Sequence, residues 1–137
     1  MYNYEDITTV HLEVTQKCSA SCPMCDRNEN GGAVNQHIRG NLQELSLEDC
    51  MTIFPPDFVM RLKTLYMCGN LGDPIVAKDT LEIFKYLREI NPNMWLSMNT
   101  MAGAKTPEWW EELARTFGRM GAVIFSVDGL EETNHLY

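Results

Sequence analysis

A complete strand–helix–strand unit can be read from residues 64–98, TLYMCGNLGDPIVAKDTLEIFKYLREINPNMWLSM. Its two ends, 64–68 and 94–98, are short apolar segments of the kind that forms buried strands. Four apolar side chains between them recur at helical spacing: Leu81, Phe84, Leu87 and Ile90. This stripe predicts a helix over 78–90, which the Asn-Pro pair at 91–92 would end. A helix between two strands favours a parallel sheet.

The same alternation extends in both directions along the chain. Strands are predicted at 11–14 and 122–127, with helices starting at the cap residues Ser46 and Thr106. The prolines at 55–56 should stop the first of these helices. The second should turn four side chains inward, namely Trp110, Leu113, Ala114 and Phe117. It should end in a C-cap at Gly121.

Residues 26–44 lack clear periodicity and are predicted to form a loop containing at most a short helix. A last helix would begin within 130–137. The order βαβαβαβ predicts an α/β fold, with a parallel sheet and right-handed crossovers, in one domain covering 1–137.

Composition excludes several functional classes. The 137 residues are 45% apolar and carry a formal net charge of −8, with only 11 Lys and Arg. A phosphate-backbone binder would need a basic face, so nucleic acid is not an expected partner. The apolar runs are short and broken by charge, unlike a membrane span or a signal peptide. Five cysteines, three of them crowded together, fit a metal site in a reducing cytoplasm better than a disulfide framework.

The crowded cysteines are Cys18, Cys22 and Cys25, in the spacing C-x3-C-x2-C. Three thiolates at this spacing can hold three corners of a cube-shaped iron–sulfur cluster and leave the fourth iron open to a small molecule. The alternative is a zinc site, whose structural form is closed by a fourth ligand. The candidates for that ligand show no standard spacing: His11, His37, Cys50 and Cys68. Cys50 is expected in the core, and Cys68 is expected to be buried near the cluster without ligating it.

Every unusual motif follows a predicted strand. The cysteines follow the first, and the motifs after the other three are Gly69-Asn-Leu-Gly-Asp-Pro74, Asn99-Thr-Met-Ala-Gly103 and Ser126-Val-Asp-Gly129. The carboxyl ends of parallel strands share one edge of the sheet, where α/β proteins place their working loops. All four motifs should therefore gather on one rim.

With these motifs in this order, the chain from His11 to Tyr137 resembles the radical S-adenosylmethionine (radical SAM) superfamily. It is most similar to the SPASM/twitch branch, whose members often carry an extra cluster-binding domain and modify peptides. The resemblance implies a partial TIM-like (β/α) barrel in which Cys18, Cys22 and Cys25 bind a [4Fe–4S] cluster. The open iron would chelate SAM, and reductive cleavage would give a 5′-deoxyadenosyl radical that abstracts hydrogen from the substrate.

The resemblance also implies the residues that contact SAM, and assigns no catalytic side chain. Gly72 and Asp73 match a Gly-Glu-Pro segment that meets the SAM amino group, with Asp shorter than the usual Glu. Met24 takes the position beside the adenine. Asn99, Ser126 and Asp128 occupy positions that help hold SAM. The match at Asn99 is loose. The others also have structural explanations: turn residues at Gly72-Asp73 and Ser126–Asp128, and simple packing for Met24.

The resemblance implies partners as well. A low-potential donor such as flavodoxin or ferredoxin would supply the electron, and a peptide is one candidate substrate. Six β/α units need about 190 residues, scaled from about 250 for an eight-fold barrel, whereas this chain supplies about four units. We therefore expect a fragment, a completing partner chain or an oligomer. The functional alternatives are a non-catalytic iron–sulfur module that transfers electrons or docks to a partner, and a zinc-stabilised interaction domain.

Overall fold

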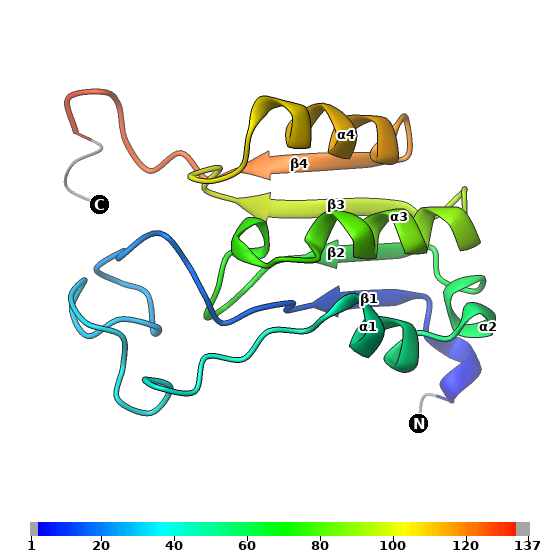
Figure 1. Cartoon of the computed structure of the whole chain (residues 1–137), viewed down its shortest axis with the longest axis horizontal. Coiled ribbons are helices and arrows are strands. Elements are labelled where there is room, and N and C mark those ends of the chain that lie inside the picture. Colours follow the sequence, from blue (N-terminus) through cyan, green and yellow to red (C-terminus); the bar gives the residue numbers. More distant parts are fainter. Residues whose placement is uncertain (1–2, 134–137) are drawn as a thin grey trace.

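Four parallel strands form one sheet in the order β1-β2-β3-β4 (Figure 1). The computed structural model describes residues 3–133. The strands are β1 Thr9–Leu12, β2 Thr64–Met67, β3 Trp95–Thr100 and β4 Gly121–Phe125. Leu12 lies opposite Met67, and Met67 lies opposite Met98, so the strands run to a common carboxyl edge. The predicted α/β class and parallel sheet are confirmed.

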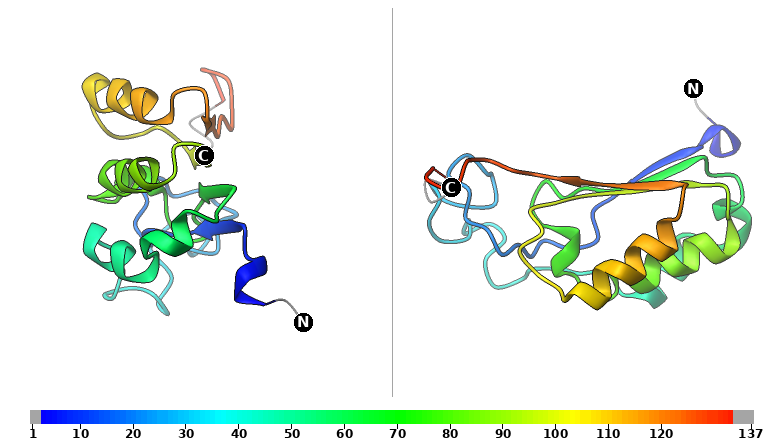
Figure 2. Two further views of the ribbon diagram at one scale, coloured as in Figure 1. Left: turned by 90° about the vertical axis from the view of Figure 1, so that its right-hand side faces the viewer. Right: turned by 90° about the horizontal axis from the view of Figure 1, so that it is seen from above.

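The helices cover one face of this sheet (Figure 2). They are α1 Leu47–Ile53, α2 Pro56–Val59, α3 Thr80–Ile90 and α4 Pro107–Phe117, with short 3-10 turns η1 Tyr4–Asp6 and η2 Pro74–Val76. Within residues 3–133, β1 and β4 each pair with a single neighbour, so this part of the chain forms an open sheet. No helix in the same range is long and apolar enough to cross a bilayer.

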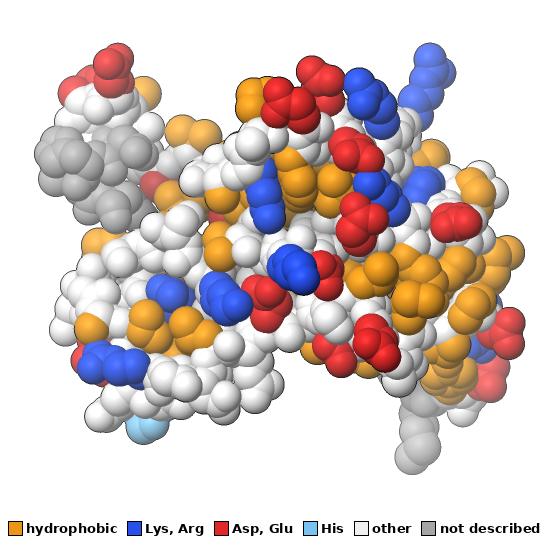
Figure 3. Space-filling model, in the orientation of Figure 1, with side chains coloured by type: hydrophobic (Ala, Val, Ile, Leu, Met, Phe, Trp, Pro, Cys, Tyr) orange, Lys and Arg blue, Asp and Glu red, His pale blue; other side chains and the backbone are white. Residues whose placement is uncertain are grey.

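The outer surface of the helices carries charges of both signs. Lys and Arg side chains are interspersed there with Asp and Glu and do not gather into one basic patch (Figure 3). Lys85, for example, lies between Glu82 of its own helix and Glu112 of α4. This face therefore lacks the basic surface that a phosphate backbone would require.

The core lies between the sheet and the helices. Alternate residues of the central strands point into it, and Leu65, Met67, Leu96 and Met98 have no exposed surface. The predicted stripe of α3 packs against them, with Phe84 and Leu87 fully buried. Phe84 also meets Phe117 of α4 edge to face, with ring centroids 4.8 Å apart, which joins the two longest helices.

Both predicted N-caps are confirmed. The Ser46 hydroxyl accepts a hydrogen bond from the Asp49 N–H, and the Asp49 carboxylate accepts one in return from the Ser46 N–H, which forms a capping box. The Thr106 hydroxyl accepts from the Trp109 N–H at the start of α4. Each helix therefore begins where its side-chain cap satisfies free backbone donors.

The predicted C-cap at Gly121 is wrong. Gly118 ends α4 with φ of 55°, a conformation that a side chain disfavours. Gly121 instead begins β4, and a Cβ there would lie 2.6 Å from the Leu96 carbonyl oxygen. Ala114, predicted to face inward, is exposed, while Leu113 and Phe117 are buried as expected.

Irregular segments depart furthest from the prediction. The prolines at 55–56 end α1, but Pro56 also begins α2 because proline suits the first helical position. Residues 26–44 contain no helix, and bridges at Thr15–Glu44 and Asn28–Val34 order this part of the chain. The helix predicted over 130–137 is a turn up to residue 133, and the remainder lies outside the described residues.

Candidate iron–sulfur and SAM site

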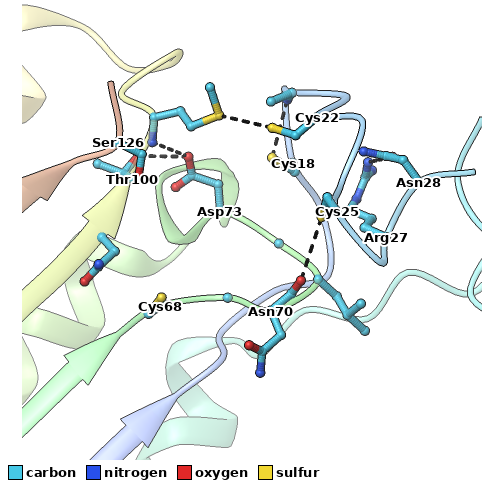
Figure 4. Close-up of a pocket in the computed structure, with 16 residues that line it drawn as sticks. Cys18, Cys22, Cys25, Arg27, Asn28, Cys68, Asn70, Asp73, Thr100 and Ser126 are labelled. Atoms are coloured by element: carbon cyan, nitrogen blue, oxygen red, sulfur yellow. Dashed lines mark hydrogen bonds between the residues drawn. The ribbon is translucent and has the colours of Figure 1, made fainter. Parts of the chain in front are cut away.

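The loops that follow the four strands meet around one cavity of about 150 Å³ at the carboxyl edge of the sheet (Figure 4). The cysteine loop after β1 contributes Cys18, Cys22 and Cys25. The opposite wall comes from 68–73 after β2, 99–101 at the end of β3, and Ser126 after β4. The structure thus brings together the four motifs that the sequence placed on one rim.

The thiols of the cysteine loop are held by its own backbone and by the opposite wall. The Ala20 N–H donates to Cys18 Sγ at 3.4 Å, and the Cys25 N–H donates to the Cys22 carbonyl at 3.2 Å. Across the cavity, Cys22 Sγ lies 3.8 Å from the sulfur of Met101, and Cys25 Sγ lies 3.9 Å from the Asn70 carbonyl oxygen. The loop is therefore anchored to the ends of both β2 and β3.

Electrostatics show that the three thiols are neighbours. Burial raises the pKa of Cys22, followed by the negative charges of Cys18 and Asp128, with a smaller contribution from Cys25. Among residues 3–133, however, no three His, Cys, Asp or Glu side chains converge closely enough to ligate a single metal ion. The three thiols all lie on one wall of the cavity, in the cysteine loop.

Gly72 and Asp73 fasten the base of the cysteine loop to β2 and β3. A Cβ on Gly72 would lie 2.0 Å from the Thr15 carbonyl oxygen, so only glycine allows this approach. The Asp73 N–H donates to the Lys17 carbonyl at 2.9 Å. The buried Asp73 carboxylate accepts from the Thr100 hydroxyl at 2.9 Å and from the Met101 N–H at 3.0 Å, and its other oxygen accepts from the Ile75 N–H. Both carboxylate oxygens are thus already hydrogen-bonded.

The other predicted contact residues divide into two groups. Asn99 and Ser126 line the cavity, although Ser126 is exposed. Met24 is 89% exposed, and neither Met24 nor Asp128 belongs to the cavity lining. Asp128 is also exposed, but its charge reaches Cys22.

Sequence reasoning missed several residues of the wall. Arg27 and Asn28, two and three positions after the last cysteine, line the cavity and are 6% and 8% exposed. Thr100 was not singled out either, although its hydroxyl binds Asp73. Adjacency to Cys25 was the available signal for Arg27 and Asn28. Cys68, expected to be buried near the cluster, lines the cavity and is partly exposed, while Cys50 is a fully buried core residue as predicted.

No protein-family model and no curated protein sequence matches the chain. Among solved structures, it is similar to BtrN, crystallised in complex with AdoMet and 2-DOIA, with a TM-score of 0.58 and 15% sequence identity. The match covers 80% of this chain and 42% of that one, so the chain spans less than half the length of BtrN. At this identity the similarity shows a shared fold alone.

Proposed function

We propose that this chain is the cluster- and SAM-binding portion of a radical SAM enzyme, similar to the SPASM/twitch branch. The observation that carries the proposal is the cavity itself, where three thiols at C-x3-C-x2-C spacing face the loops after β2, β3 and β4. In this proposal the open sheet is one part of a partial (β/α) barrel. BtrN was crystallised with AdoMet and shares this fold, which supports SAM as the ligand.

The residues present fit a [4Fe–4S] cluster held by Cys18, Cys22 and Cys25. All three thiols lie in one short loop that lines the cavity, and three thiolates at this spacing can each bind a different iron of one cluster. The Ala20 N–H already donates to the Cys18 sulfur, a contact that persists with a thiolate. When bound, the cluster supplies an open iron for SAM and one electron for its cleavage to methionine and a 5′-deoxyadenosyl radical.

The chain itself would bind and orient SAM. Because both oxygens of Asp73 already accept hydrogen bonds, the SAM amino group would meet backbone carbonyls of 69–72, and Asp73 would act by holding that loop against β3. Asn99 and Ser126 would bind the carboxylate or ribose from the adjoining wall. Met24 and Asp128 are exposed and do not line the cavity, so SAM would have to extend out of the cavity to contact them.

The proposal includes partners. A flavodoxin or ferredoxin would deliver the electron in the cytoplasm, and a peptide is the proposed substrate class. Further strands, from more of the same chain, a completing chain or a second copy, would extend the sheet at an edge and add substrate contacts. Nucleic acid and membranes are not proposed partners, given the net charge of −8.

Anaerobic reconstitution with iron and sulfide tests the proposal. We expect a brown protein absorbing at about 400 nm, as thiolate-bound clusters do. Addition of SAM and dithionite should then release 5′-deoxyadenosine and methionine in equal amounts, measured by liquid chromatography. A protein with a full cluster that yields no 5′-deoxyadenosine would instead be an iron–sulfur module for electron transfer or docking. A protein that takes up zinc and no cluster would overturn the proposal.

A further inference from the structure

The buried pair Arg27 and Asn28 lies beside Cys25, on the side of the cysteine loop away from Asp73 and Thr100 (Figure 4). Arg27 Nε donates to the Gln16 carbonyl at 3.1 Å, and Nη1 donates to Asn28 Oδ1 at 3.0 Å. No hydrogen bond from Nη2 to the described residues is present, and no carboxylate within residues 3–133 forms an ion pair with this guanidinium. Arg27 as a residue is only 6% exposed, and its guanidinium has no counter-ion in this part of the chain.

The Asn28 side chain has an unused donor at the same place. Its Nδ2 is buried and has no hydrogen-bond partner among the described residues. The orientation of the amide is fixed by its neighbour, because a guanidinium only donates and so must face Oδ1. Nδ2 is therefore the amide atom turned away from Arg27, in a residue that lines the cavity.

An unpaired cation and an unpaired N–H donor are both costly to bury. Both costs are offset if the cavity holds an anion that accepts hydrogen bonds. A cluster bound by three thiolates is such a group, because its net charge is negative and its sulfur atoms accept hydrogen bonds. An exposed arginine on the same loop would interact only weakly with such an anion, since solvent screens its charge.

We propose that Arg27 and Asn28 are positioning residues for the cluster, Arg27 through its buried positive charge and Asn28 through a hydrogen bond from Nδ2 to a cluster or cysteine sulfur. This inference rests on the proposed function. Charge and hydrogen bonds at the sulfur atoms set the reduction potential of such clusters. The pair stabilises the reduced cluster, which carries one more negative charge, and so makes the electron easier to deliver.

The test is the midpoint potential of the reconstituted cluster, titrated anaerobically and followed by electron paramagnetic resonance. Arg27→Gln should make one-electron reduction tenfold less favourable, a shift of about 59 mV to more negative potential. Asn28→Asp is nearly the same size, keeps the acceptor for Arg27 and replaces the free donor by a negative charge. It should shift the potential at least as far in the same direction.

Two variants separate a local effect from a general one. Arg27→Lys keeps the charge and should change the reduction equilibrium less than threefold. Arg39→Gln removes the same charge from an exposed arginine of the same loop and should leave the potential unchanged. Iron and sulfide content and circular dichroism accompany each titration. If Arg27→Gln loses its fold, Asn28→Asp and Arg27→Lys decide the question.

The outcomes are distinguishable from those for the proposed function. A full cluster with wild-type potential in both Arg27→Gln and Asn28→Asp would overturn this inference while leaving the proposed function intact. An equal shift in Arg39→Gln would also overturn it, because a remote charge would then suffice. A wild-type chain that assembles no cluster would remove both proposals together.

Discussion

An arginine and a nearby asparagine occur at each end of the parallel strands, and the two pairs are used in opposite ways. The end where the strands begin is the amino edge, and the end where they finish is the carboxyl edge. At the amino edge, Arg88 donates to six backbone carbonyls: Asn91, Pro92, Met94, Thr116, Phe117 and Met120. Asn91 is buried beside it and donates from Nδ2 to the carbonyls of Val59 and Leu62. At the carboxyl edge, Arg27 makes two hydrogen bonds, and Nδ2 of Asn28 makes none in the described part of the chain.

The difference separates structure from function. Arg88 binds carbonyls around the carboxyl ends of α3 and α4, and Asn91 binds carbonyls at and just after the end of α2, where helix carbonyls lack partners within their own helix. The hydrogen-bonding capacity of both side chains is consumed by the fold. The donors of Arg27 and Asn28 remain available beside three thiols, although both residues are more than nine-tenths buried. An unused buried donor that lines a cavity, as Asn28 Nδ2 does, indicates a ligand site, whereas fully used donors indicate a structural role; Arg61 Nε is also buried without a partner among residues 3–133, but it does not line the cavity.

The largest expected effect concerns the thiols at the carboxyl edge. Cys22→Ala should abolish cluster binding, because two thiolates of one loop cannot hold three corners of the cluster. Iron and sulfide per chain after anaerobic reconstitution measure this directly. Cys50→Ala is the matched control, since Cys50 is fully buried in α1 and burial raises its thiol pKa to about 11, so it is not an available thiolate. Equal loss of iron in Cys50→Ala would overturn the ligand assignment.

The next effect belongs to the amino edge. Arg88→Met should lower the free energy of unfolding by about 3 kcal/mol, because it removes a charged donor that binds six carbonyls, including the part-buried ones of Thr116 and Met94. Urea denaturation of the cluster-free protein gives the value. Arg115→Met removes an exposed arginine whose one ion pair within residues 3–133 is with Glu111, and it should cost less than about 0.5 kcal/mol. If Arg27→Met destabilised the cluster-free protein as much as Arg88→Met, the contrast between the edges would be lost.

Features of the two edges could be predicted from the sequence where the interacting residues are close together along the chain. Strand and helix positions followed from local apolar patterns, the cap at Ser46 from the acids of the turn after it, and the cap at Thr106 from the Pro107 beside it. The rim followed from topology alone, since parallel strands end together. Arg88 could not be assigned its role, because its acceptors include the end of α4, 28 to 32 positions along the chain.

The same limit explains the errors within the site. Gly72-Asp73 was correctly placed on the rim, but the roles of its atoms depend on Thr15, Lys17 and Thr100, which are remote in sequence. Gly121 was assigned as a C-cap because glycine is common at helix ends. Glycine is required at this position because a side chain would collide with the Leu96 carbonyl of the neighbouring strand β3. Local pattern identifies a glycine as special without identifying the contact that makes it so.

Alanine variants of Asn91 and Asn28 test the same contrast between the two edges, with smaller expected changes in unfolding free energy. Asn91→Ala should cost about 2 kcal/mol of unfolding free energy, because the buried Leu62 carbonyl loses its side-chain donor and the Val59 carbonyl keeps only the Leu62 N–H. Asn28→Ala should cost less than about 1 kcal/mol in the cluster-free protein, since only the hydrogen bond from Arg27 is lost. Urea denaturation of both proteins gives the two values. A reversed order would mean that Asn28 serves the fold rather than a ligand.

The smallest expected effect concerns Glu44, which binds residues at the base of the cysteine loop. The Glu44 carboxylate accepts from Lys17 Nζ at 3.2 Å, the Thr15 hydroxyl at 3.3 Å and the Lys78 N–H at 3.3 Å. Burial raises the pKa of Glu44, but the hydrogen bonds from Lys17 and Lys78 and the charge of Lys17 outweigh it, so the pKa is lowered overall.

A pKa that is lower in the folded chain makes the ionised form of Glu44 stabilising. That contribution is present above the unfolded value of about 4.3 and is lost as the pH falls through the folded pKa. Glu44→Gln should therefore cost less than about 1 kcal/mol at pH 7, because Lys17 is partly exposed, and the cost should shrink as the pH is lowered toward 3. Urea denaturation at both pH values measures the difference, with the exposed Glu48→Gln as the control. A difference that persisted undiminished at pH 3 would show that shape and packing, and not the charge of Glu44, hold the loop to the sheet.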